Sequence, residues 1–113
     1  MGIKVGFRKI FVNVPIAGTA VPISSTPIFT PEFEIYVPTG NTGSAYIGNI
    51  DVENSSGADG GWIPRTKGEV ITFTASENVS MSSGDFFDLS KIYVDVNTSG
   101  DDVIVQYKVQ ESA

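Results

Sequence analysis

The feature that most constrains the fold is a series of short apolar runs with a two-residue period, separated by clusters of turn-forming residues. Thr, Val, Ile and Phe dominate the runs, and Gly, Asn, Ser and Asp dominate the segments between them. β-Branched and aromatic side chains favour strands, whereas the small polar residues favour turns. Apolar residues do not recur at spacings of three, four and seven beyond a single turn, so no helix is predicted. The sequence therefore predicts an all-β protein.

The predicted strands are short and closely spaced. Their ranges are 4–14, 20–24, 33–37, 45–52, 62–64, 69–75, 91–97 and 102–109. Seven or eight strands at this spacing predict a single antiparallel β-sandwich or a small barrel. The length of 113 residues is the usual size of one domain.

The first predicted strand has apolar residues on both of its faces. One face carries Val5, Phe7, Lys9 and Phe11. The other face carries Lys4, Arg8, Ile10, Val12 and Val14. Because the apolar face changes near Lys9, we expect a bulge or a change of partner strand at that position.

Four of the six prolines fall in one stretch, at Pro15, Pro22, Pro27 and Pro31. Proline cannot donate a ladder hydrogen bond, so this stretch is expected to be extended, at a sheet edge or partly outside the sheet. Such an arm is expected to bury little against its own domain. We therefore expect residues 1–31 to pack on, or be swapped between, subunits, and residues 32–113 to form the β-sandwich body.

The charge distribution divides the chain at the same place. Residues 1–31 contain three cations and no acid, and residues 32–113 contain all 13 acids and four cations, a net charge of −9. An acidic body has the wrong sign for nucleic-acid binding. The cations of the first strand either face an acidic neighbour or are simply solvated. Our candidate subunit-interface residues are Lys4, Phe7, Arg8, Lys9, Phe11, Pro15, Pro22 and Pro27.

The sequence offers little material for a catalytic or metal centre. It contains no His, the commonest general base, and no Cys, a principal nucleophile. Both residues are also main ligands of transition metals. Asp85 and Asp88 could act as a carboxylate pair, but they are also ordinary turn acids. Asp51, Glu53 and Asp59 could hold calcium, although their spacing does not match the helical calcium loop. We predict no catalytic residue, no metal and no cofactor.

An aromatic platform is the alternative to a protein interface. Trp62, Tyr36 and Tyr46 could together bind a carbohydrate if they formed one exposed surface. No apolar run approaches the roughly 18 residues of a membrane span. The first residues do not have the pattern of a signal peptide, so neither a membrane nor a secretion route is expected.

Several turn-and-strand motifs occur in a recognisable order. They are Val14–Ser24 (VPIAGTAVPIS), Thr39–Gly48 (TGNTGSAYIG), Gly68–Thr74 (GEVITFT), Leu89–Asp95 (LSKIYVD) and Gly100–Tyr107 (GDDVIVQY). This order resembles small β-sandwich structural proteins of tailed bacteriophages, over roughly residues 12–109. Residues 2–11 lie outside the pattern and are expected to carry a protein-specific attachment.

The resemblance implies a function in the virion and no catalytic residues. It implies a subunit of the head, collar or tail that acts as a decoration, cement or adaptor protein, made in the cytoplasm of a bacterial host. Its partners would be capsid or neighbouring virion subunits. It also implies a homo-oligomer, and by analogy we expect a trimer.

Overall fold

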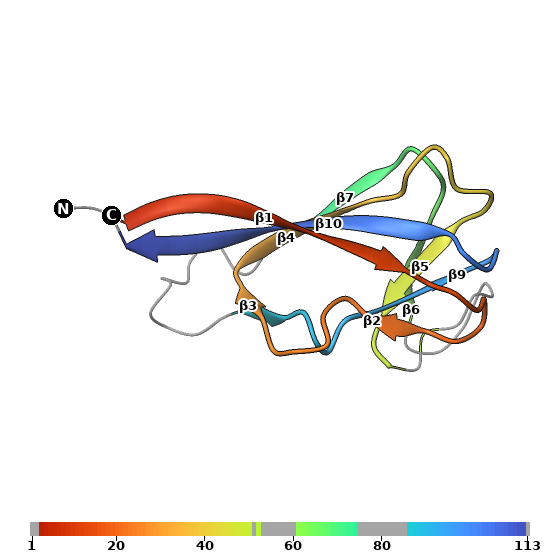
Figure 1. Ribbon diagram of the computed structural model, residues 1–113, viewed down its shortest axis with the longest axis horizontal. Coiled ribbons are helices and arrows are strands. Elements are labelled where there is room, and N and C mark those ends of the chain that lie inside the picture. The colour runs from red at the N-terminus through yellow and green to blue at the C-terminus, as the bar shows by residue number, and fades with distance from the viewer. Residues whose placement is uncertain (1–2, 51, 53–60, 75–85, 113) are drawn as a thin grey trace.

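The computed structural model describes residues 3–50, 52, 61–74 and 86–112. Over these residues it contains ten strands and no helix (Figure 1). The strands are β1 (Ile3–Asn13), β2 (Val21–Pro22), β3 (Phe29–Thr30), β4 (Glu32–Tyr36), β5 (Ala45–Gly48), β6 (Gly61–Arg65), β7 (Val70–Thr74), β8 (Phe87–Asp88), β9 (Tyr93–Val96) and β10 (Asp102–Ser112). The all-β prediction is confirmed. None of the described residues belongs to a helix that could cross a membrane.

The strands form two four-stranded sheets and one two-stranded sheet. The first sheet has the order β1-β10-β4-β7, the second has the order β2-β9-β5-β6, and β3 pairs with β8. Every pairing is antiparallel. The two larger sheets enclose one apolar core, as expected for a small β-sandwich.

The core follows from the alternation of the strands. In β4, Phe33 and Ile35 point inward and are buried, and Glu34 and Tyr36 alternate with them. Ile47 of β5 is fully buried on the facing sheet. Full burial of a side chain of this size contributes about 1.5–3 kcal/mol. The alternation of Phe33, Ile35 and Val37 with Glu34 and Tyr36 in the sequence predicts that the first three point inward and the other two outward, and the structure confirms this.

Aromatic packing connects the small third sheet to the first. The Phe33 ring stacks on Phe73 of β7 with their centroids 4.8 Å apart. The Phe87 ring of β8 meets Phe33 edge-on at 5.0 Å. Stacked and edge-to-face pairs are favoured arrangements, so these contacts hold β8 against the sandwich.

Strand β1 has no bulge at Lys9. Its register with β10 is unbroken from Ile3 opposite Ser112 to Asn13 opposite Asp102. The change of apolar face in the sequence has another cause, because Val12 is buried in the core whereas Phe7 and Phe11 point outward and are exposed. The expectation of a bulge is wrong because those two phenylalanines do not belong to the core.

The segment that follows β1 is integrated into the domain. Val14, Ile23 and Thr30 are all buried. The Ile23 amide donates a hydrogen bond of 2.9 Å to the carbonyl oxygen of Ile92. The expectation that a Pro-spaced arm would bury little against its own domain is therefore wrong for these residues, because apolar side chains placed between the prolines fill the core.

Two separated sequence motifs meet at one end of the sandwich. The Asp101 carboxylate accepts hydrogen bonds from the amides of Thr42 (3.1 Å) and Gly43 (2.9 Å). The Asn41 side chain donates to the carbonyl oxygen of Asp102 (2.6 Å) and accepts from its amide (3.1 Å). These bonds tie the TGNTG loop to the turn between β9 and β10.

Gly43 lies in the most tightly packed part of this contact. A Cβ atom at Gly43 would lie 2.9 Å from Cβ of Asn97, whereas one at Gly40 would meet nothing within 4 Å. We expect Gly43→Ala to lower the free energy of unfolding by about 1–3 kcal/mol through steric strain. Gly40→Ala is the matched control and should change it by less than about 1 kcal/mol. Urea unfolding of both variants tests this, and equal effects would contradict it.

Strands β1 and β10 extend beyond the sandwich. Each has 11 residues, but β4 pairs only with the stretch from Ile104 to Tyr107 of β10. Figure 1 shows the two strands running side by side past the body, so that the start of β1 and the end of β10 lie at the same tip. The molecule measures 47 × 26 × 23 Å as a result. A two-stranded ribbon is only marginally stable alone in water, so its attachment to the body matters.

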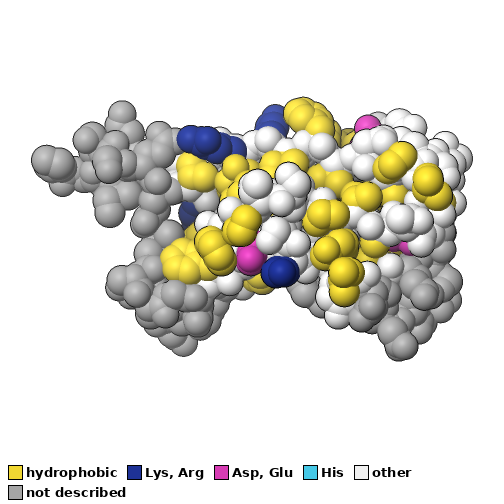
Figure 2. All heavy atoms as spheres, turned by 60° about the horizontal axis from the view of Figure 1, so that its bottom comes forward, with side chains coloured by type: hydrophobic (Ala, Val, Ile, Leu, Met, Phe, Trp, Pro, Cys, Tyr) yellow, Lys and Arg dark blue, Asp and Glu magenta, His cyan; other side chains and the backbone are white. Residues whose placement is uncertain are grey.

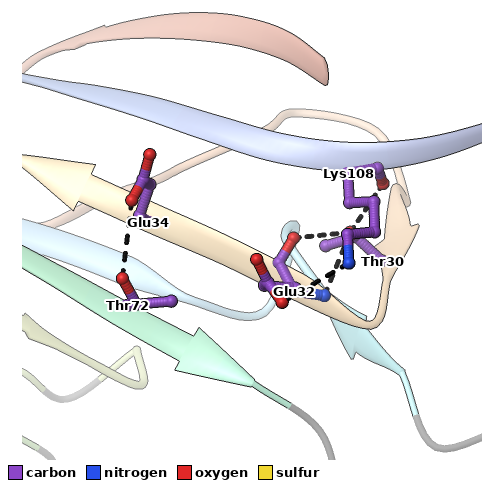
Figure 3. A network of polar contacts seen from close by, with 5 residues as sticks. All are labelled: Thr30, Glu32, Glu34, Thr72 and Lys108. Atoms are coloured by element: carbon purple, nitrogen blue, oxygen red, sulfur yellow. Dashed lines mark hydrogen bonds and ion pairs between the residues drawn. The ribbon is translucent and has the colours of Figure 1, made fainter. Parts of the chain in front are cut away.

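Thr30 makes that attachment. Its hydroxyl is fully buried and lies 2.8 Å from the carbonyl oxygen of Lys108 and 2.9 Å from that of Glu32. It can donate its single proton to either oxygen, and it accepts from the Glu32 amide at 3.3 Å. The bond to Lys108 fixes β10 where it leaves the sandwich (Figure 3).

Candidate subunit-binding surface

The outer face of the first sheet carries side chains in straight rows across the strands. Residues opposite each other in an antiparallel ladder share a face and lie about 4.5–5.5 Å apart. The strand registers place four apolar side chains in one such row, which we call the apolar row: Phe11, Ile104, Tyr36 and Val70. The next row, the polar row, consists of Lys9, Gln106, Glu34 and Thr72.

The ends of the apolar row are strongly exposed. The exposed fraction is 73% for Phe11 and 54% for Val70. Phe7, beyond the polar row on β1, is 57% exposed. Single exposed apolar residues are normal, but a contiguous apolar strip with polar neighbours is typical of an interaction surface.

A groove lies between the two rows. Its volume is about 320 Å³, and it is lined by Lys9, Glu34, Tyr36, Val70, Ile104 and Gln106. The lining contains apolar side chains, the Lys9 cation, the amide of Gln106 and the Glu34 carboxylate, which accepts a hydrogen bond from Thr72. It can therefore accept an apolar side chain with a polar or acidic neighbour.

Most of the charged groups on this face already have partners. The Thr72 hydroxyl donates to Glu34 at 3.4 Å, and Lys108 Nζ lies 3.5 Å from Glu32 Oε1 (Figure 3). Lys9 is exposed and makes no ion pair with any residue that the structure describes. It is the cation on this face that remains available to an outside carboxylate.

The candidate interface residues do not form one surface. Phe7, Lys9 and Phe11 lie together on the outer face of β1, and the structure adds Ile104 and Val70 to them. Arg8 is exposed on the opposite side of the strand, and for Lys4 only the backbone is described. Pro22 is half-buried in β2 of the second sheet, and Pro15 and Pro27 are exposed in loops. Ile104 and Val70 could have been found from the sequence, because each is an apolar residue at an outward position of an alternating strand.

Other exposed apolar side chains lie away from this face. Phe29 of β3 is 64% exposed, and Ile16 and Ile50 are exposed in loops. Figure 2 brings forward the side that carries β2 and β3 in Figure 1 and shows hydrophobic side chains across its middle, with few charged groups among them. No register aligns these residues into a row, so the first sheet carries the stronger candidate.

The three aromatic residues of the alternative platform are separated. Tyr36 points outward from the first sheet. Tyr46 alternates with the buried Ala45 and Ile47 of β5, so it points outward from the second sheet, and its hydroxyl accepts from the Asn97 amide at 3.1 Å. The two tyrosines thus face opposite sides of the sandwich. Trp62 lies in β6 next to β5, and its side chain is outside the described part of the structure.

The acidic candidates are described only in part. Asp51, Glu53, Asp59 and Asp85 lie outside the described residues. Asp88 is held in a turn, where its Oδ1 accepts from the Ser90 hydroxyl (2.8 Å) and the Ser90 amide (3.0 Å). These hydrogen bonds, the hydroxyl first, hold the pKa of Asp88 below its ordinary value of 3.8. Among the described residues, no three acidic side chains cluster in a way that could hold a metal ion.

The lowered pKa of Asp88 predicts a pH-dependent contribution to stability. Its folded-state value lies below the unfolded-state value of 3.8, so the ionised form stabilises the fold above that pH. The contribution is lost as the pH falls through the lower folded-state pKa. We therefore expect Asp88→Asn to destabilise the protein at neutral pH and to match the wild type in strong acid.

Thermal unfolding of both proteins over this pH range is the measurement. Ser90→Ala removes the largest cause of the shift and should reproduce the loss at neutral pH. A difference between wild type and Asp88→Asn that stays constant with pH would refute the turn role.

Comparisons with known proteins show only distant similarity. No protein-family profile matches the sequence. No curated protein sequence matches it significantly. A chain from Bacillus endospore appendages, described as disulfide-linked pili, is 18% identical with a TM-score of 0.45, and the match covers 99% of this chain and 93% of that one. A chain of a cyanophage capsid asymmetric unit is 15% identical with a TM-score of 0.29, covering 97% and 85%. Neither likeness assigns a function.

Proposed function

We propose that this chain is a structural subunit of a tailed-phage virion that binds neighbouring virion subunits through the outer face of its first sheet. The observation that carries the proposal is the apolar row, which ends in the exposed Phe11 and Val70, beside Lys9, which has no ion pair with a described residue. The order of the turn-and-strand motifs, which resembles small phage structural proteins, supports the virion setting.

The size and chemistry of the face suit a protein partner. Aromatic side chains bury about 150–250 Å² each, and a standard interface needs roughly 800 Å² per partner. Phe7 and Phe11 can supply the aromatic anchors, with Ile104, Tyr36 and Val70 as the surrounding apolar contacts. Aromatic anchors near the centre of an interface usually account for most of its binding free energy.

Binding is a better-supported role than catalysis. The chain has no His and no Cys, and Asp88 is ionised and engaged in a turn. We propose decoration, cement, collar or tail-adaptor roles on this basis, with a homo-oligomeric state and a trimer as the expected stoichiometry.

Removal of β1 is not a usable test of this proposal. A deletion of residues 1–14 would also remove Val12 and Val14 from the core and leave β10 paired only with β4, over Ile104 to Tyr107. Loss of binding after such a deletion would report unfolding. Point substitutions on the outer face avoid this problem.

We expect Phe11→Ser to weaken subunit association at least tenfold while changing the free energy of unfolding by less than about 0.5 kcal/mol. Phe29→Ser is the matched control, because Phe29 is similarly exposed but lies in another sheet. Size-exclusion chromatography with light scattering measures the oligomer at micromolar concentration. A wild-type monomer, or equal effects of both substitutions, would contradict a role of this face in self-association.

The virion location needs a separate test. Particles produced from the genome that encodes the chain can be labelled with a gold-conjugated antibody against it. Label on the head, collar or tail is the expected result, and its position distinguishes the three. Particles without label would refute the virion assignment.

A further inference from the structure

Strand β1 is the edge of the first sheet. It has 11 residues, and β10 pairs with it on one side along its whole length. No described strand lies on its other side. Such an edge presents a row of backbone N–H and C=O groups that another strand can bind.

We propose that the segment bound by this chain is an extended strand of a different subunit, which adds to the free edge of β1 and carries an acidic side chain between two apolar ones. This inference rests on the proposed function and specifies the chemistry of its partner.

The pattern follows from the register of an added strand. Alternate residues of such a strand would lie on the outer face, beside the odd-numbered residues of β1. The three outer positions there are Phe11, Lys9 and Phe7 in order. Apolar residues fit beside the two phenylalanines, and a carboxylate fits beside Lys9, because opposite charges and apolar pairs stabilise cross-strand neighbours. The pattern apolar-x-acidic-x-apolar reads the same in both directions, so it holds for either strand orientation.

Charge complementarity favours an acidic partner. Lys9 is the cation among the outer-face residues of β1, and residues 1–31 contain no acid. The other carboxylates on the outer face already have partners within the chain: Glu32 pairs with Lys108, and Glu34 accepts a hydrogen bond from the Thr72 hydroxyl. A carboxylate from outside would therefore meet Lys9 without competition from a described carboxylate partner.

A second copy of this chain fits the edge poorly. If two β1 strands paired antiparallel so that Phe7 of each met Phe11 of the other, Lys9 would lie opposite Lys9, and like charges in that position are destabilising. The edge strands of the two larger sheets, β1, β7, β2 and β6, contain no acidic residue. Edge-to-edge pairing of two copies through these sheets cannot supply the carboxylate.

The test uses the full chain and two synthetic peptides. The first is acetyl-STVTETVTS-amide, which presents Val, Glu and Val on one side of a strand, and the second has Gln in place of Glu. Isothermal titration calorimetry measures their binding to the wild type, Lys9→Gln and Phe11→Ser. The Glu peptide should bind the wild type at least fivefold more tightly than the Gln peptide. Lys9→Gln should remove that difference, and Phe11→Ser should weaken both peptides at least tenfold.

Hydrogen exchange distinguishes strand addition from docking on the face. With the Glu peptide bound, the β1 amides that point away from β10 should become protected. Binding without this protection would overturn strand addition. Failure of both peptides to bind, or equal binding of the two, would overturn the acidic-strand proposal.

The two proposals fail in different ways. A chain found on labelled particles that does not bind the Glu peptide refutes the partner chemistry alone. A chain that is absent from the particles refutes the virion function whether or not the peptide binds.

Discussion

The ladder between β1 and β10 is the interaction on which the rest of the structure depends. It pairs the first and last described strands over 11 residues and places β10 next to β4 in the middle of the sheet. Because the register is unbroken, Ile10 and Val12 stay on the core face and Phe7, Lys9 and Phe11 stay on the outer face. A slip of one residue would bury Lys9 and expose Val12, so the apolar core and the outer face are specified by the same register.

The sequence predicted the elements well where alternation was strict. The range 33–37 gave both the strand and its inward residues, because one face is purely apolar. It failed at β1, where apolar residues occupy both faces. A sequence pattern shows that a residue is apolar, but it does not show whether the face opposite is core or solvent. We therefore expected a bulge at Lys9, whereas the structure has a regular strand with two exposed phenylalanines.

The candidate surface was only partly predictable for a related reason. Phe7, Lys9 and Phe11 are close in sequence and were recognised together. Ile104 and Val70 join them only through pairings across β10, β4 and β7, which depend on long-range register. The prolines were misleading, since they mark segments that are extended but also carry the buried Val14 and Ile23. Extended backbone and exposure to solvent are different properties.

The position of Ile3 opposite Ser112 has a mechanical consequence. A force that pulls these two ends apart acts on one residue pair at a time. The ladder would therefore open pair by pair, starting at the tip. A force applied along a neighbouring strand would instead act on many pairs of the ladder at once, in shear. The ribbon therefore resists a shearing force directed along its strands far better than a force that pulls its two ends apart.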